Sequence, residues 1–500
     1  MMLTLGYDIG SSSIKCSLWD VGKKSVVASG QHPVQEMEIL SPFPGWAEQH
    51  PEQWWEYIIL LTRKLLSEKG IRGDQIGAIG IAYQMHGLVV VDAAGAVLRP
   101  AIIWCDSRAV DIGEQAFNKI GREFCLQHLL NSPGNFTASK LRWVREHEPE
   151  IYGRIHKIML PGDYIAMKLT GEISTTVSGL SEGIFWDHLR GAVSSELLDL
   201  FEIDKSLLPE PRPTFSVQGR VSQSAASLLG LPAGIPVAYR AGDQPNNAFS
   251  LNVLNPGEIA ATAGTSGVVY AVTDSMVHDP LSRINVFTHV NNSEKARRLG
   301  ILLCINGTGI LNSWLRRNVS PELGYVEMNA LAAKAPAGSG GLQLFPFGNG
   351  AERMLSNANV GSHMAGLDFN RHGRAEILRA GQEGIAFSFR YGVDILRELG
   401  VGVTVVRAGK SNLFLSPLFS QTLATILGAS IELHDTDGAQ GAARGAALGA
   451  GMFATVSDAF GSQDNKATID PVSDDSARMG DFYRHWLAGL QNLLNSREGA

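Results

Sequence analysis

The sequence predicts an α/β protein of two domains built around an internal repeat. Its 500 residues exceed what one hydrophobic core usually organises. The 55 glycines favour an α/β protein with many turns between strands and helices. Moving the sequence along itself by 254 positions places residues 258–274 on residues 4–20 and pairs Gly10 with Gly264. The chain therefore repeats a unit of strand, short hydroxyl-rich turn and strand.

Periodicity and turn residues place the elements. The first half begins with strands at about 3–9, 13–20 and 25–30, followed by a helix that starts at Pro51 and runs to about residue 70. Further strands are expected within 75–84 and 87–104, and helices within 108–121 and 139–155. The second half is expected to have strands at 258–274 and 402–409, a small-residue helix over 438–456, and a polar linker with a helix in 461–496.

The domain boundary is expected where Asn and Pro accumulate. Residues 245–257 are rich in both and precede the second copy of the repeat. This gives an N-terminal domain of residues 1–250 and a C-terminal domain of residues 251–500. The domain to which residues 460–500 belong is left open.

Composition and charge exclude several classes of partner. The net charge is −7 and there is no dense run of Lys and Arg, so neither nucleic acid nor an anionic membrane is an expected partner. The four cysteines are scattered without metal-ligand spacing, which suits a reducing compartment. No apolar run is long enough to span a membrane, and the beginning of the chain does not resemble a signal peptide. We expect a cytoplasmic protein whose partners are small molecules.

The two short turns are candidate phosphate sites. Ser11, Ser12 and Ser13 form the first, and Gly264, Thr265 and Ser266 the second. Each could be an ordinary hairpin turn, but a pair of turns rich in backbone N–H groups and hydroxyls could hold one nucleotide. Only the first copy has an acid at the strand end, Asp8, where Thr262 stands in the second. A carboxylate beside a polyphosphate calls for a divalent cation, so Asp8 predicts Mg²⁺ and the turns predict ATP.

Residues 404–411 imitate a nucleotide-binding motif. Their sequence "TVVRAGKS" follows the phosphate-loop pattern G-x-x-x-x-G-K-[ST], except that Thr404 replaces the first glycine. A Cβ there obstructs the wrap of backbone amides around the phosphates. We therefore expect this loop to hold another part of the nucleotide.

Asp243 is the candidate general base. It lies in "AGDQ", next to the expected boundary, and transfer of a phosphoryl group to an alcohol benefits from a carboxylate that accepts the hydroxyl proton. The alternative is an Asx-type turn, which the following "PNN" makes plausible.

Two stretches are candidates for binding a polyol. Met85 and His86 stand at a strand break before Gly87, where a histidine could hydrogen-bond a polyol or be a core residue. Trp104 with Asp106 and Arg108 suits the face of a sugar and its hydroxyls. The alternative there is a helix cap by Asp106 with Arg108 in solvent.

These motifs, in this order, resemble those of the FGGY family of carbohydrate kinases, along nearly the whole chain. The stretches that carry the resemblance are "YDIGSSSIK", "GWAEQHPEQWW", "QMHGLV", "IIWCDSRA", "TASKLRWVREHEP", "LPGDYIAMKLTGE", "AGDQ", "AGTSG", "EILRAGQEGIAFSFR" and "GAARGAALGAG". Within the family the chain is most similar to the kinases that phosphorylate D-xylulose. The resemblance implies two actin-like, ribonuclease H-like ATPase domains with ATP and sugar in a central cleft, and it is compatible with a homodimer.

The resemblance also implies roles for individual residues. Asp8 would help to position Mg²⁺, and Asp243 would be the catalytic base. The nucleotide would be bound by the two turns and the loop after residue 408, through Ser11, Ser12, Ser13, Lys15, Gly264, Thr265, Ser266, Gly409 and Asn412. The sugar would be lined by Met85, His86, Trp104, Asp243 and Gln244.

Three departures from the family pattern leave alternatives open. Gln244 stands where kinases of D-xylulose commonly have Asn. Asn135 does not fit the usual start of the motif that contains "TASKLRW", and the loop after residue 408 is longer than usual in the family. The acceptor could therefore be ribulose, gluconate or glycerol. Two further hypotheses are an actin-like ATPase scaffold and a sugar-sensing module without turnover.

Overall fold

The computed structural model describes residues 2–461 and 465–498 of the chain, and these form two compact units. Unit 1 comprises Met1–Asn252, Val286–Leu299 and Thr436–Ser462, and unit 2 comprises Val253–Asn285, Gly300–Asp435 and Gln463–Ala500. The chain thus returns to unit 1 twice after the expected boundary near residue 250.

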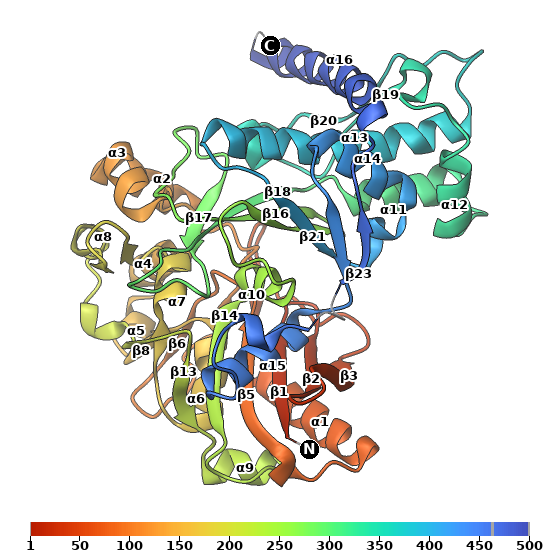
Figure 1. Ribbon diagram of the computed structural model, residues 1–500. Coiled ribbons are helices and arrows are strands. Elements are labelled where there is room, and N and C mark those ends of the chain that lie inside the picture. Colours follow the sequence, from red (N-terminus) through yellow and green to blue (C-terminus); the bar gives the residue numbers. More distant parts are fainter. Residues whose placement is uncertain (1, 462–464, 499–500) are drawn as a thin grey trace. The chain divides into compact units, whose positions relative to one another are not determined.

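Unit 1 contains a six-stranded sheet in the order β13-β14-β5-β1-β2-β3 (Figure 1). Its strands are β1 (Leu3–Ile9), β2 (Ile14–Asp20), β3 (Ser25–His32), β5 (Ile76–Tyr83), β13 (Phe215–Arg220) and β14 (Pro236–Gly242). The hairpin strands β1, β2 and β3 pair antiparallel, whereas β1, β5 and β14 are parallel. The strands predicted at the start of the chain agree with β1, β2 and β3 to within two residues at each end.

The helices of unit 1 cover this sheet and the loops beside it. They are α1 (Pro51–Lys69), α2 (Val110–Ile120), α3 (Arg122–Phe124), α4 (Thr137–His147), α5 (Pro149–Tyr152), α6 (Pro161–Thr170), α7 (Val177–Glu182), α8 (Ser195–Phe201), α9 (Gln223–Leu229), α10 (Asp243–Ser250) and α15 (Gly438–Gly449). Short strand pairs join the loops: β4 (Glu48–Gln49) with β7 (Ala101–Ile102), β6 (Val89–Val91) with β8 (Lys157–Met159), β9 (Thr175–Thr176) with β12 (Pro211–Arg212), and β10 (Trp186–Asp187) with β11 (Ala192–Val193). Trp54, Ile58 and Leu65 of α1 are buried in the core of unit 1.

Helix α15 packs on the sheet of unit 1 although it lies late in the sequence (Figure 1). A Cβ on Gly6 of β1 would lie 2.0 Å from the carbonyl oxygen of Ala439, and one on Gly80 of β5 would lie 2.0 Å from that of Ala442. Glycines on the strands and alanines on the helix therefore allow backbone contact. This close packing makes α15 part of unit 1, although its residues come late in the chain, after most of unit 2.

Unit 2 repeats the sheet of unit 1. Its strands β18 (Leu299–Ile305), β16 (Gly267–Thr273), β15 (Glu258–Ala263), β21 (Val405–Gly409), β22 (Ile431–His434) and β23 (Asn465–Ile469) are neighbours in this order. The β15–β16 hairpin is antiparallel, β15, β21 and β22 are parallel, and β23 is antiparallel. This arrangement confirms the internal repeat, with β15 in the place of β1.

In its described residues, unit 2 also contains five α-helices and a hairpin: α11 (Gly309–Val319), α12 (Tyr325–Ala332), α13 (Arg374–Glu398), α14 (Pro417–Leu427), α16 (Ser473–Glu498), and β19 (Gln343–Phe347) with β20 (Gly361–Ala365). Strand β17 (Asn285–Thr288) starts at the last residue of the first segment of unit 2, and its other residues belong to unit 1.

The structure also resolves two points that the sequence left open or placed differently. The last part of the chain belongs to unit 2, where residues 465–469 of the expected linker form an edge strand. Residues 245–250 of the Asn-rich stretch, where the domain boundary was expected, belong to helix α10.

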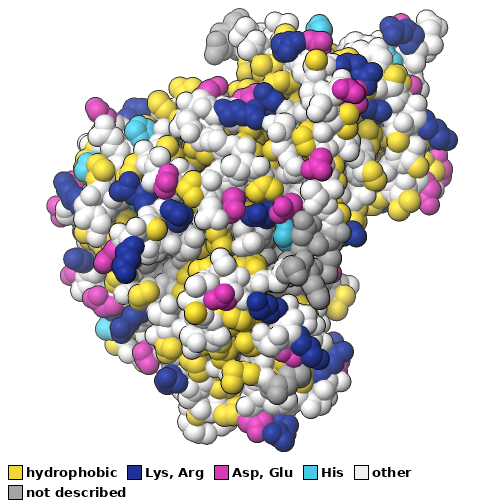
Figure 2. Space-filling model, viewed as in Figure 1, with side chains coloured by type: hydrophobic (Ala, Val, Ile, Leu, Met, Phe, Trp, Pro, Cys, Tyr) yellow, Lys and Arg dark blue, Asp and Glu magenta, His cyan; other side chains and the backbone are white. Residues whose placement is uncertain are grey.

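The described surface carries no large area of a single charge on the face shown in Figure 2. Basic and acidic side chains are interspersed there. Within residues 2–461 and 465–498, no helix is long and apolar enough to cross a membrane.

Candidate active site

Three neighbouring parallel strands bring the candidate residues of unit 1 to one edge of its sheet. Asp8 is the penultimate residue of β1, the turn of residues 84–87 follows β5, and Asp243 follows β14. Asp8 is in register with Ala82, and Gly242 with Tyr83. Because the carboxyl ends of parallel strands meet at the same edge, residues far apart in sequence become neighbours there, which is where ligands bind in sheets of this kind.

Asp8 is a carboxylate enclosed by the start of α15. Burial raises its pKa, the ammonium of Lys15 opposes that rise, and Asp437 adds to it. Lys15 is its partner across the β1–β2 hairpin. A Cβ on Gly438, the first residue of α15, would lie 2.4 Å from Oδ2 of Asp8, so only glycine leaves room for this carboxylate.

Asp243 is the first residue of α10 and lies in the field of a second acid. Burial raises its pKa to about 7, the nearby Asp8 adds to the rise, and hydrogen bonds from Gln244 oppose it. The expected alternative, a simple Asx turn, does not describe this helix start. A carboxyl group with a pKa near neutrality can both hold and release a proton at physiological pH, as a general base must.

His86 stands in a strained turn beside Asp243. Its φ of 62° is rare outside glycine, and its Nδ1 lies 2.9 Å from the carbonyl oxygen of Glu182. Its ring packs against those of Phe136 and Phe287, with centroid distances of 4.7 and 5.2 Å. The side chain is half-buried, so it is not a fully enclosed core residue.

Met85 lies deeper than His86. It is 3 % exposed, and a Cβ on Gly242 would lie 2.6 Å from its Cγ and 2.4 Å from Oε2 of Glu182. Burial raises the pKa of Glu182, and the nearby Asp243 adds to the rise. Sequence reasoning missed Glu182, Phe136 and Phe287 because only the fold brings them to the 84–87 turn.

Trp104 is available to a ligand, whereas its neighbours in the sequence are not. It is 53 % exposed and its Nε1 lies 3.3 Å from Oγ of Ser11. Arg108 is buried in ion pairs with Asp106 at 2.6 Å and with Glu48 at 2.7 Å. The sequence offered two interpretations of Asp106 and Arg108, a sugar-binding face and a helix cap with Arg108 in solvent. Both are wrong about Arg108, because its side chain is buried.

The first candidate phosphate turn is a four-residue hairpin turn between β1 and β2. The N–H of Gly10 donates to the carbonyl of Ser13 at 3.2 Å, and Nε2 of Gln49 donates to the carbonyl of Ser11 at 2.7 Å. Ser12 is exposed, and Ser11 and Ser13 are half-buried, as is Lys15. The turn is thus fixed by its backbone while its three serines remain at least partly accessible.

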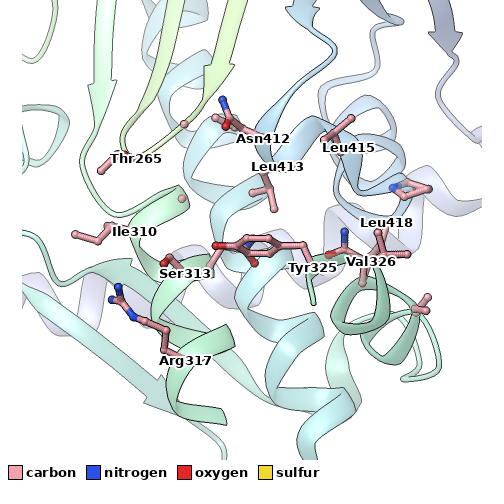
Figure 3. A pocket seen from close by; sticks show the side chains of 18 residues that line it. Thr265, Ile310, Ser313, Arg317, Tyr325, Val326, Asn412, Leu413, Leu415 and Leu418 are labelled. Carbon is pink, nitrogen blue, oxygen red and sulfur yellow. The ribbon is translucent and has the colours of Figure 1, made fainter. Parts of the chain in front are cut away.

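The second turn lies at a cavity of about 1000 Å³ in unit 2 (Figure 3). The N–H groups of Gly309 and Ile310, at the start of α11, donate to the carbonyls of Gly264 and Thr265 at 2.9 and 3.0 Å. These bonds fasten the turn to α11. Of the expected turn residues, Gly264 and Thr265 line the cavity and Ser266 does not.

Most of the remaining cavity wall comes from α11, α12, the loop before α14 and the first residues of α14. Figure 3 shows the ring of Tyr325 in the middle of the view, between Asn412 and Arg317, and all three residues line the cavity. Asn412 has a φ of 52°. A cavity of this size is large enough for a nucleotide. Sequence reasoning missed α11 and α12, whose residues form ordinary helices without a binding motif.

The imitation phosphate loop does not have the structure of one. The N–H of Lys410 donates to the carbonyl of His434, and Ser411 is extended, so no α-helix begins there to present its N-terminus to phosphate. Neither residue lines the cavity, and nor does Gly409. Asn412 is the residue of this loop that does.

Among the described residues, no group of three or more His, Cys, Asp or Glu side chains could hold a metal ion. Mg²⁺ in a nucleotide site does not require such a group, because it is held by one or two carboxylates, several waters and the phosphates. The carboxylate oxygens of Asp8 fit that pattern. They would suit no metal that prefers thiolate or imidazole ligands.

Comparison with known proteins identifies the family. Residues 3–250 match the N-terminal domain of the FGGY family of carbohydrate kinases, and residues 259–454 match its C-terminal domain. The chain is 28 % identical to a xylulose kinase of Escherichia coli (strain K12), over 89 % of this chain and 88 % of that protein.

Solved structures show the same relationship. A xylulose kinase from Rhodospirillum rubrum is similar at a TM-score of 0.88 and 29 % identity, over 98 % of this chain and 99 % of that one. A Plasmodium falciparum glycerol kinase with ADP has the same TM-score at 22 % identity, over 99 % and 98 % of the two chains, which shows the shared fold alone. The expected family and fold are therefore confirmed, and the chain belongs to the FGGY family of carbohydrate kinases, which are ATP-dependent sugar kinases.

Proposed function

We propose that this kinase transfers the γ-phosphoryl group of ATP to D-xylulose and forms D-xylulose 5-phosphate. The observation that carries the proposal is Asp243, a carboxyl with a pKa of about 7 beside the strained turn of Met85 and His86. The relatives named xylulose kinase favour D-xylulose as the acceptor.

The acceptor would bind at the edge of the unit 1 sheet. His86 and Trp104 offer a ring nitrogen and an indole face, which suit hydroxyl groups and the apolar face of a sugar. Gln244 follows Asp243 on α10 and supplies an amide donor and acceptor. Met85, in the same turn as His86, is buried and would form the floor of this site.

The nucleotide would bind in the cavity of unit 2. Gly264, Thr265 and Asn412 line it, and Ser266 and Gly409 would assist from the adjoining backbone. On unit 1, Ser11, Ser12, Ser13 and Lys15 would hold the transferred phosphate. Asp8 would hold Mg²⁺, whose chemistry is to offset the charge of the phosphoryl oxygens.

The chemistry assigned to Asp243 is proton transfer. Its carboxylate would accept the proton of the terminal hydroxyl as that oxygen attacks the γ-phosphorus. The new oxygen–phosphorus bond forms while the bond from the γ-phosphorus to the β-phosphate oxygen breaks, and ADP leaves. The same pKa, about 7, would let Asp243 release the proton to water afterwards.

The test is ADP release in the presence of ATP and Mg²⁺ against D-xylulose, D-ribulose, L-ribulose, gluconate and glycerol. The proposal expects the highest kcat/KM with D-xylulose. A higher value for another acceptor would replace D-xylulose but keep the kinase. ATP hydrolysis that no acceptor stimulates would instead favour an ATPase scaffold, and sugar binding without ADP formation would favour a sensor.

We further propose that the enzyme acts in the cytoplasm, where ATP is abundant. Three of its cysteines, Cys16, Cys105 and Cys125, are free thiols, which suits a reducing compartment.

A further inference from the structure

A buried lysine on α4 joins the two loops that carry the proposed acceptor residues. The side chain of Lys140 is fully buried, and its Nζ donates to the carbonyl oxygens of His86 and Ile103 at 2.9 Å each. His86 belongs to the turn after β5, and Ile103 directly precedes Trp104. One ammonium group therefore holds the backbone at both loops.

The same face of α4 makes a second contact with the first loop. Thr137, three residues before Lys140 and on the same side of the helix, donates through Oγ1 to the carbonyl of Gly87 at 3.3 Å. Two consecutive carbonyls of the 84–87 turn are thus bonded to the first turn of α4. His86 has a φ of 62°, a conformation that surrounding contacts must maintain.

The position of Trp104 depends on the same link. The carbonyl of Ile103 also accepts the N–H of Asp106 at 3.2 Å, which closes the turn around Trp104. The indole of Trp104 then reaches Oγ of Ser11 in the first phosphate turn at 3.3 Å. A displacement of Lys140 would therefore move both His86 and Trp104.

A lysine in this place is costly unless its bonds are needed. Burial lowers the pKa of Lys140 to about 7, a fall that Asp106 and Cys105 oppose and Arg108 reinforces. A methionine would fill the space with no charge to desolvate. Even the neutral amine retains two N–H donors, and two backbone carbonyls are there to accept them. The link between the loops therefore persists on both sides of the titration.

We propose that Lys140, with Thr137, forms a clamp that sets the distance between the His86 and Trp104 loops, and that Lys140 is a positioning residue for the acceptor sugar. The clamp rests on the proposed function, because it assigns these loops to the acceptor. Lys140 would not touch the sugar, and its effect would fall on acceptor binding. Nucleotide binding would change little, because Gln49 and the bond between Gly10 and Ser13 hold the first turn without Trp104.

The test replaces Lys140 with Met and compares it with a matched control. Lys157 likewise donates to two backbone carbonyls, those of Ser206 and Leu208 at 2.5 and 3.1 Å, but both belong to a single segment of unit 1, so this lysine does not join two loops. We expect Lys140→Met to raise KM for D-xylulose at least about tenfold, the effect of losing a charge-assisted hydrogen bond, with KM for ATP changed less than about twofold. Lys157→Met should leave both KM values unchanged.

A second readout needs no substrate. Amide hydrogen exchange in peptides covering residues 84–88 and 103–107 should rise in Lys140→Met and stay at the wild-type level in Lys157→Met. This separates the two hypotheses, because a wild-type protein that phosphorylates no acceptor would refute the proposed function while the exchange still tests the clamp. Thr137→Val removes one hydrogen bond and keeps the side-chain shape, so it should raise the KM for the acceptor and the amide exchange by smaller amounts. If Lys140→Met does not fold, Thr137→Val tests the clamp in its place.

Two results would overturn the clamp. One is a folded Lys140→Met variant with wild-type exchange in both loops. The other is faster exchange with an unchanged KM for the acceptor, which would show that the loops are held by Lys140 but that acceptor binding does not depend on it.

Discussion

Replacing Asp243 with Asn should abolish most of the activity and at the same time stabilise the protein at alkaline pH. Asparagine keeps the shape of the side chain but cannot accept the hydroxyl proton. Loss of general base catalysis lowers kcat by ~10²- to 10⁴-fold. The fold should be unaffected, because Asp243 lies half-buried at the start of α10 rather than in the core.

The stability change follows from the pKa of Asp243. The pKa rises from 3.8 to about 7 on folding, so the folded protein binds this proton more tightly than the unfolded chain. The stability associated with that proton is fully present below the unfolded pKa and is lost as pH rises to about 7. The full rise corresponds to at most ~4 kcal/mol, and because Asp243 is only half-buried we expect ~1 to 2 kcal/mol at pH 8. The substituted asparagine lacks this penalty because an amide does not ionise.

The assay is urea unfolding of wild type and Asp243→Asn at pH 5 and pH 8, with ADP release at pH 8. The variant should gain stability relative to wild type as pH rises. Asp199→Asn on the exposed face of α8 is the control, and it should change neither property. Turnover within tenfold of wild type would refute the base, and a stability difference that is the same at both pH values would refute the raised pKa.

Three further predictions concern the site and its support. The kcat/KM for the acceptor should fall about tenfold for each pH unit below ~7, because Asp243 must be ionised in the free enzyme, and an unchanged value at pH 5.5 would contradict this. Gly309→Ala places a Cβ 2.1 Å from the carbonyl oxygen of Gly264, so it should displace the second turn and raise KM for ATP at least about tenfold while KM for the acceptor stays unchanged. Arg108→Gln removes the guanidinium that pairs with the fully buried Asp106 inside unit 1, so the free energy of unfolding in urea should fall by ~3 to 5 kcal/mol, and a fall below ~1 kcal/mol would contradict the buried ion pair.

Local elements could be predicted from the sequence because their signals are local. Strands β1 and β2 lie on either side of Ser11–Ser13, and α1 starts at Pro51. Each of these features depends on residues that are only a few positions apart. The internal repeat was visible for the same reason, since both hairpins carry their own turn residues. Asp8 and Asp243 could likewise be nominated as site residues, because the motifs that contain them are short.

Long-range packing decided the remainder. Helix α15 follows the strands of unit 2 in sequence, but its alanines fit the glycines of β1 and β5, so it belongs to unit 1. Arg108 has the sequence pattern of a surface residue, but Asp106 and Glu48 enclose it in the fold. Much of the wall of the unit 2 cavity comes from α11 and α12, whose side chains carry no motif.

The reactivity of the site has the same origin. Asp8 and Asp243 stand 235 positions apart in the chain. Each is an ordinary carboxylic acid as a residue type, and the sequence was enough to nominate both. Their raised pKa values arise only in the fold, because desolvation of both carboxyls, the effect of Asp437 on Asp8 and the effect of Asp8 on Asp243 depend on distance in space rather than on distance along the chain.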